Sequence, residues 1–187
     1  MAPQSRELRV AFGRFATGVT VVTCRNQHEM AHGATVNAFT AVSLEPALCQ
    51  VTLTRKSKAC SYLEGAPFAV NVLGVGQVDT AWHFAGRPTE PGPEWAERGS
   101  TPYLVGSAAA YFCRPWRTYD GGDHLIVVGE VEHVDVTDDE PLLFYCGAFR
   151  EIGAVETGTH WGGSLDCPDA GWFDARSSFT PLRPHAA

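Results

Sequence analysis

The sequence predicts a mainly β protein, in which about six strands form an antiparallel sheet that is closed or nearly closed. Short runs of β-branched and apolar residues recur along the chain, such as VTVVTC at 19–24 and FAVNVL at 68–73. Glycine, proline and acidic residues separate these runs and mark turns. Apolar residues at helical spacing are confined to a few short segments, so only short helices are expected, flanking the sheet.

The N-terminal half is expected to begin with a helix that Ser5 caps and Gly18 ends. The apolar stripe of this helix consists of Leu8, Ala11, Phe12, Phe15 and Val19. Further elements are expected as strands at 19–24, 31–44, 47–54 and 68–73 and helices at 56–63 and 75–84, with a turn at 26–29.

In the second half, residues 87–101 are rich in proline, glycine and charge, which predicts a surface loop. Strands are expected at 104–114, 125–136 and 142–149, with a turn at 120–123. Polar and apolar residues alternate in 125–136, so one face of that strand is expected to contact water.

Size and composition narrow the function classes. A chain of 187 residues predicts one domain, and a net charge of -7 gives no general attraction to nucleic acid or anionic lipid. No apolar run approaches the roughly 18 residues of a membrane span, and the N-terminus lacks the apolar core of an export signal. The six cysteines contain no CxxC pair and predict buried reduced thiols in a cytoplasmic protein.

The character of the sequence changes after residue 150. Residues 1–150 carry the periodic segments, whereas 151–187 have little periodicity but contain four aromatic residues: Trp161, Trp172, Phe173 and Phe179. A disordered tail usually holds fewer aromatics. We therefore expect an extension that packs on the body or on a second subunit, with a loose tail as the alternative.

The stretch from Gly33 to Lys58 carries the strongest functional signal. Its small residues let the backbone approach a flat ring, and the Asn37 amide can bind the polar edge of that ring. A phosphate can be held by nearby hydroxyls and an ammonium group, those of Thr40, Ser43, Ser57 and Lys58. Arg55 and Lys56 add to this basic cluster. The stretch predicts a site for an aromatic ligand with an anionic tail, with a polar strand and a solvated turn as the alternative.

His124 is the histidine best placed for function, since the turn Gly122-Asp123 leads into it at the start of a strand. There it can donate a hydrogen bond to a carboxamide or phosphate, although a half-solvated histidine at a strand end has the same spacing. The remaining histidines show no HExxH or similar spacing, so no metal site is expected. Rossmann, Walker and nucleophile-elbow motifs are also missing.

Several motifs in order resemble the short-chain flavin reductase family, the small reductase components of two-component flavin monooxygenases. They are FATGVTVVT (15–23), GATVNAFTAVSLEPAL (33–48), FAVNVL (68–73), HFAGRP (83–88), GDH (122–124), VGEV (128–131) and PLLFYCGAFR (141–150). The resemblance implies a six-stranded split barrel of FMN-binding type with Greek-key order. It also implies a homodimer with flavin near the subunit interface.

The resemblance further implies an NAD(P)H:flavin oxidoreductase that reduces FMN or FAD with NADH or NADPH and supplies a partner monooxygenase. His124 would orient the nicotinamide as the catalytic residue. The flavin would contact residues from four parts of the chain: Thr35, Val36, Asn37, Ala38, Thr40, Ser43, Ser57, Lys58, Asp123 and Arg150.

Two departures from the family pattern keep other functions open. Cys146-Gly147-Ala148 replaces the usual polar residues of the last motif, and the tail after Arg150 is long for a reductase. One alternative is an enzyme that keeps FMN tightly bound and acts directly on a small organic substrate. Another is a non-catalytic protein that binds flavin or heme.

Overall fold

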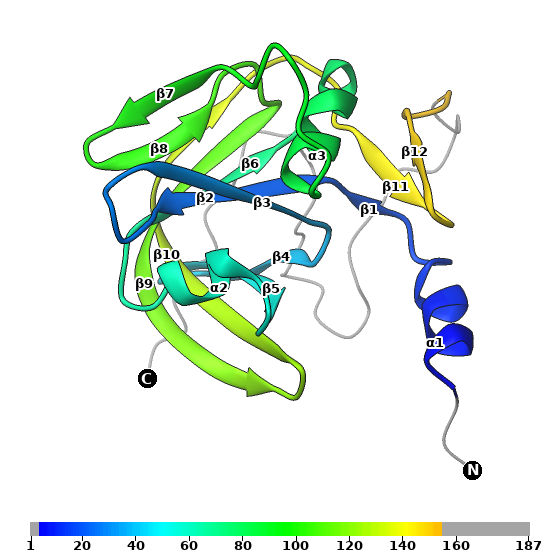
Figure 1. Cartoon of the computed structure of the whole chain (residues 1–187), viewed down its shortest axis with the longest axis horizontal. Helices are drawn as coiled ribbons and strands as arrows, with labels where there is room; N and C mark the ends of the chain where they lie inside the picture. Colours follow the sequence, from blue (N-terminus) through cyan, green and yellow to red (C-terminus); the bar gives the residue numbers. More distant parts are fainter. Residues whose placement is uncertain (1–3, 155–187) are drawn as a thin grey trace, which may run out of the picture. The chain divides into compact units, whose positions relative to one another are not determined.

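A seven-stranded antiparallel sheet is the centre of the computed structural model, which describes residues 4–154 (Figure 1). Its strand order is β3-β2-β6-β9-β10-β5-β4. In chain order these strands are β2 (Thr20–Arg25), β3 (Ala31–Val36), β4 (Phe39–Leu44), β5 (Ala47–Thr54), β6 (Phe68–Val72), β9 (Ala109–Gly121) and β10 (His124–Val136). The mainly β, antiparallel prediction is confirmed.

Two smaller sheets and short helices surround the main sheet. The small strands are β1 (Thr17–Gly18), β7 (Trp95–Arg98), β8 (Thr101–Leu104), β11 (Leu143–Tyr145) and β12 (Ala148–Arg150), paired as β1-β11-β12 and β7-β8. The helices are α1 (Ser5–Phe12), α2 (Lys58–Tyr62), the 3-10 turn η1 (Val75–Gln77) and α3 (Val78–Phe84). No helix within residues 4–154 has the length and apolarity to cross a membrane.

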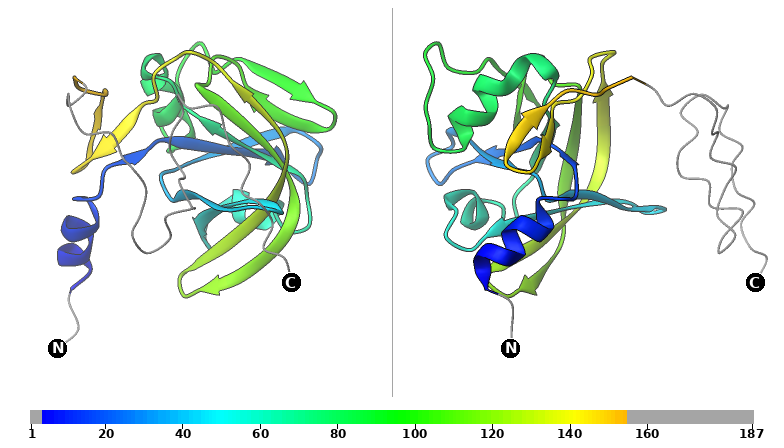
Figure 2. Two further views of the ribbon diagram at one scale, coloured as in Figure 1. Left: turned by 180° about the vertical axis from the view of Figure 1, so that it is seen from behind. Right: turned by 90° about the vertical axis from the view of Figure 1, so that its right-hand side faces the viewer.

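The core lies inside the curved sheet. β-branched and aromatic side chains from β2, β5 and β6 are fully buried there, including Val22, Val51 and Phe68. The long strands β9 and β10 bend strongly (Figure 2). Their register shifts between Val128 and Gly129 and between Val131 and His133, as expected where β-bulges increase curvature.

The expected single strand at 31–44 is wrong, because the chain breaks at Asn37-Ala38 into β3 and β4. These two strands lie at opposite edges of the sheet, yet only two residues join them. An extended residue spans at most about 3.6 Å, so the sheet must curl until its edges meet at this point. No ladder joins β3 to β4 along the described chain, so the sheet has seven strands and is open along this seam.

Other predicted boundaries also change. The first helix ends at Phe12 with Gly13 as its cap, Gln4 and not Ser5 precedes it, and it buries none of its residues. The expected loop at 87–101 contains β7, which pairs with β8. The expected strand at 104–114 is displaced, because Leu104 ends β8 and β9 begins at Ala109. The last strand, expected at 142–149, is a hairpin of β11 and β12.

Turn chemistry explains that hairpin and yields a prediction. Cys146 has a φ of 48° and Gly147 a φ of 81°, the two left-handed positions of a tight hairpin turn. Asparagine adopts such a φ more readily than cysteine, and Asn-Gly is the preferred pair. Cys146→Asn is therefore expected to raise the free energy of unfolding by about 0.5–1 kcal/mol. Urea denaturation measures this, with Cys146→Val as the comparison, which is expected to lower stability.

The prediction of buried reduced thiols is confirmed for Cys24, Cys49, Cys60 and Cys113, while Cys146 is exposed. Cys167 and the aromatic residues of the C-terminal extension lie outside the described residues.

Burial raises the pKa of the Cys24 thiol from 9.0 to about 12. Between these values the unfolded chain loses a proton that the folded chain keeps, so the stability from this neutral thiol falls as pH rises. Above pH 9, we expect Cys24→Ala to lose stability more slowly than wild type, by about 1 kcal/mol per pH unit. Urea unfolding at a series of alkaline pH values measures the difference, and parallel curves would contradict it.

Candidate flavin site at the seam of the sheet

The largest concentration of predicted site residues lies in a pocket of about 560 Å³ where β3 meets β4 and β5. Its lining combines backbone-rich segments with hydroxyl groups and one histidine. The residues are Phe12, Ala34, Thr35, Val36, Asn37, Ala38, Thr52, Leu53, Thr54, Ser57, Gly121 and His124. The backbone N–H of Thr52 donates to the Ala38 carbonyl at 2.9 Å and fixes the break between β3 and β4. The seam that opens the sheet therefore also creates this seam pocket.

Six of the eleven predicted site residues line this pocket: Thr35, Val36, Asn37, Ala38, Ser57 and His124. The other five do not line it. Thr40 and Ser43 lie on β4, Lys58 begins α2 beside Ser57, Asp123 precedes His124, and Arg150 ends β12. The other six lining residues were not predicted from the sequence, because their approach to this pocket depends on long-range pairing and packing: Phe12, Ala34, Thr52, Leu53, Thr54 and Gly121.

The basic cluster divides into two parts. Arg55 donates from Nε to the Gly122 carbonyl at 2.8 Å and pairs with Asp120, so its guanidinium ties β5 to the β9–β10 turn. Lys58 is exposed beside Ser57. Ser57 occupies the N-cap position of α2, but its hydroxyl forms no capping hydrogen bond. Ser57 and Lys58 thus remain the groups suited to an anionic tail.

His124 is held by its neighbour. Its Nδ1 lies 2.6 Å from Oδ1 of Asp123, and its side chain is 42% exposed. The hydrogen bond and charge of His124 hold the pKa of Asp123 below its usual value. An ionised Asp123 accepts from Nδ1–H, so Nε2 is the ring nitrogen that stays available to a ligand in the pocket that His124 lines.

A second, apolar crevice of about 250 Å³ adjoins the seam pocket and shares Thr35, Val36 and Asn37 with it. Its other walls come from the junction between β1 and β2, the C-terminal part of α3 and the β11–β12 hairpin, and β1, α3 and this hairpin can be followed in Figures 1 and 2. The residues of these walls are Val19, Ala81, Trp82, Ala85, Phe144, Gly147 and Phe149. The sequence did not predict this crevice, although Trp82 borders the HFAGRP motif and Phe149 belongs to the last motif.

The small residues at the start of β3 have a different role from the expected one. A Cβ at Gly33 would lie 2.7 Å from the ring of Phe84, so the ring that approaches this glycine belongs to α3. The Thr35 hydroxyl donates to the Ala81 carbonyl at 2.7 Å and adds a second link between β3 and α3. Gly33 and Thr35 therefore position α3 as a wall of the crevice.

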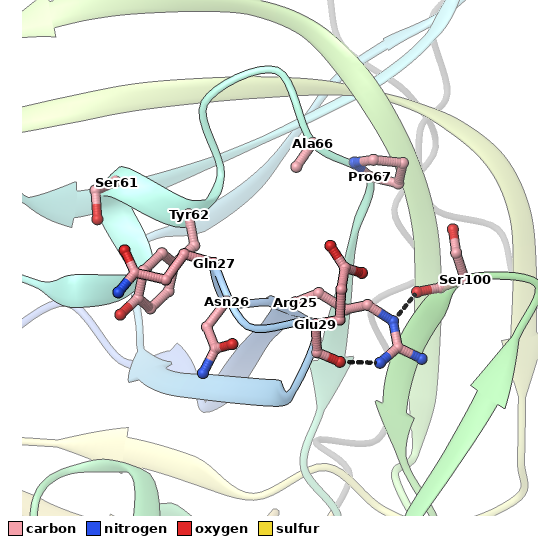
Figure 3. Close-up of a pocket in the computed structure, with 9 residues that line it drawn as sticks. All are labelled: Arg25, Asn26, Gln27, Glu29, Ser61, Tyr62, Ala66, Pro67 and Ser100. Atoms are coloured by element: carbon pink, nitrogen blue, oxygen red, sulfur yellow. Dashed lines mark hydrogen bonds between the residues drawn. The ribbon is translucent and has the colours of Figure 1, made fainter.

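A third hollow of about 450 Å³ lies at the turn between β2 and β3 (Figure 3). Arg25 donates to the carbonyl oxygens of Ser100 and Glu29 and pairs with Glu97 at 2.6 Å. This guanidinium is used by the fold to join the β2–β3 and β7–β8 turns. We therefore assign the hollow no ligand. Residues 4–154 contain no group of three metal-ligating side chains.

Comparison with known proteins identifies the family of the chain. A family model described as flavin reductase like domain matches residues 12–153. An NADH-dependent flavin reductase of Rhodococcus sp is 36% identical over 160 residues, 83% of this chain and 90% of that protein. The reductase component of 4-hydroxyphenylacetate 3-monooxygenase from Thermus thermophilus is 43% identical over 136 residues, 72% of this chain and 87% of that protein.

Solved structures show the same likeness. Flavin reductase PheA2 in its native state has a TM-score of 0.77 and 34% identity, covering 81% of this chain and 100% of that one. The Streptomyces globisporus NADH:FAD oxidoreductase SgcE6, in complex with NAD and FAD fragments, has a TM-score of 0.75 and 35% identity, covering 82% and 96%. The chain therefore belongs to the family of flavin reductase like domains.

Proposed function

We propose that this protein is an NADH-dependent flavin reductase that reduces FMN or FAD and supplies the reduced flavin to a partner monooxygenase. The observation that carries the proposal is the pair of adjoining pockets at the seam, which share Thr35–Asn37 and have His124 at one wall. The relatives include an NADH-dependent flavin reductase and the reductase component of a monooxygenase. This favours the proposed function over a fixed-flavin enzyme or a non-catalytic flavin or heme carrier.

The residues present fit a flavin. Backbone groups at Val36 and Asn37, with the Asn37 side chain, would hold the polar pyrimidine edge of the ring. Ser57 and Lys58 would hold the phosphate, and Thr40 and Ser43 would approach the same tail from β4. When bound, the flavin accepts a hydride from the nicotinamide and carries the reducing equivalents away. The chain supplies binding, orientation and shielding from water.

His124 would position the nicotinamide. Asp123 holds the imidazole at Nδ1, so Nε2 is presented in one orientation. Hydride transfer to flavin needs no strong base, so the contribution of His124 is expected in donor binding and not in proton transfer. Arg150 does not line the seam pocket. We propose that it binds a phosphate of the cofactor or of the substrate outside this pocket.

The assembly we propose is a split-barrel homodimer of Greek-key order with flavin near the subunit interface. Apolar side chains at the N-terminus are exposed on one subunit, with Phe12 at 72% and Phe15 at 77%. Exposed apolar residues of this size are typical of interaction surfaces. Light scattering is expected to give twice the mass of one chain. The buried free thiols favour a cytoplasmic location.

The proposed function is tested by mixing protein, NADH and free FMN or FAD without oxygen. We expect catalytic loss of the visible flavin absorbance, and reoxidation when air and a flavin monooxygenase are added. Flavin that stays oxidised with both NADH and NADPH would contradict the proposal.

A further inference from the structure

We infer that the apolar crevice beside α3 holds the dimethylbenzene end of the flavin, so that Trp82 and Phe149 are specificity-determining residues for the ring system. This inference rests on the proposed function and adds the direction in which the ring is bound. The seam pocket and the crevice share Thr35–Asn37 as lining residues, and a planar ring placed over this segment would have one end in each.

The size of the crevice suits one substituted benzene ring. Its volume is about 250 Å³, whereas a closed apolar cavity of about 150 Å³ binds benzene. Aromatic side chains and small residues form most of its surface, with Ala81 and Ala85 leaving the space that larger residues would fill. A ring that carries two methyl groups can therefore bury both methyls against carbon.

The difference in polarity between the two ends of the flavin ring decides which end enters the crevice. The pyrimidine end carries two carbonyl groups and an N–H, and each would lose about 1–3 kcal/mol if buried without a partner. In the crevice the Thr35 hydroxyl already donates to the Ala81 carbonyl. The seam pocket instead offers the hydroxyl groups of Thr52 and Thr54. The polar end is therefore favoured in the seam pocket and the apolar end in the crevice.

The walls of the crevice are held in place before a ligand arrives. The Trp82 and Phe149 rings meet edge to face at 5.3 Å with an interplanar angle of 80°, and Phe149 packs on Phe144 at 5.6 Å. The guanidinium of Arg87 lies 4.4 Å from the centre of the Trp82 ring. Such contacts fix the orientation of an indole that is 36% exposed.

The test compares riboflavin with 7,8-didemethylriboflavin, which lacks only the two methyl groups. Dissociation constants are measured by flavin fluorescence in the wild-type protein and in Trp82→Ala and Ala85→Leu. In the wild type we expect the demethylated analogue to bind about tenfold more weakly, because each of the two buried methyl groups contributes about threefold, the lower end of the usual range. In both variants this ratio is expected to fall toward one, because the first removes a wall and the second fills the space.

Lys58→Ala is the matched control. It is expected to weaken FMN relative to riboflavin and to keep the tenfold methyl ratio. Thermal denaturation confirms that each variant is folded, and Ala85→Leu provides an independent answer if Trp82→Ala is unstable. A wild-type ratio near one, or a tenfold ratio that persists in both variants, would overturn the inference while flavin reduction stands. A wild-type protein that binds neither flavin would instead contradict the proposed function.

Discussion

His124→Ala is expected to raise the KM for NADH about tenfold while changing the dissociation constant of the flavin less than twofold. His124 lines the seam pocket and its Nδ1 is paired with Asp123, so Nε2 is the ring nitrogen left for a bound ligand. Losing one such hydrogen bond to a bound ligand costs about 0.5–1.5 kcal/mol, or up to about 3 kcal/mol when one partner is charged. Steady-state kinetics with varied NADH, together with flavin binding by fluorescence, separates the two constants.

His133 provides a matched control on the same strand. Its Nε2 lies 2.8 Å from the carboxylate of Asp135, and its side chain is 45% exposed, close to the 42% of His124. It lines neither of the two adjoining pockets. His133→Ala is therefore expected to leave both constants at the wild-type value. Equal effects of the two substitutions, or a His124 effect confined to flavin binding, would contradict the assignment.

Gly33→Ala is expected to destabilise the protein by about 1–3 kcal/mol and to weaken flavin binding as well. The new Cβ would lie 2.7 Å from the Phe84 ring and 3.1 Å from Val21 Cγ1. We expect α3 to move away from the new methyl group. This helix also carries the Ala81 carbonyl that accepts the hydrogen bond of Thr35. Movement of α3 would open the crevice. Urea denaturation and riboflavin binding measure the two effects.

Gly76→Ala is the control for this prediction, because no atom lies within 4 Å of the position of its Cβ. It lies in the turn that leads into α3 and is expected to change neither stability nor binding by a measurable amount. A second change tests the cause. Combining Gly33→Ala with Phe84→Leu is expected to restore part of the stability that Gly33→Ala loses. If the double variant instead loses the sum of the two single losses, the clash with Phe84 is not the cause.

Local patterns predicted the strands well where one strand is one apolar run. β5 was predicted with its bounds, and β2, β6 and β10 within about a residue, because β-branched runs end at turn residues. The failures share a cause. Residues 31–44 read as one strand because nothing local marks Asn37-Ala38 as the place where the chain changes its pairing partner from β2 to β5.

The candidate site also divides into a part that local sequence predicts and a part that depends on long-range packing. The seam pocket was largely predictable, since Thr35–Ala38 and Ser57 lie in the one small-residue and hydroxyl-rich stretch, and His124 ends a recognisable turn. The crevice was not, because its walls come from the β1–β2 junction, α3 and the β11–β12 hairpin, and these segments meet only through packing. Gly33 was expected to make room for a ligand ring, but the ring beside it is that of Phe84. The sequence cannot distinguish the two cases, because a glycine is the same letter whichever ring packs against it.

The central claim is that flavin is a substrate that is released and not a fixed cofactor. The most direct measurement is NADH oxidation under air, with and without added FMN or FAD, on protein whose visible spectrum is recorded as purified. We expect colourless or pale protein whose NADH oxidation depends on added flavin and saturates with it. Yellow protein that oxidises NADH slowly and ignores added flavin would contradict the account.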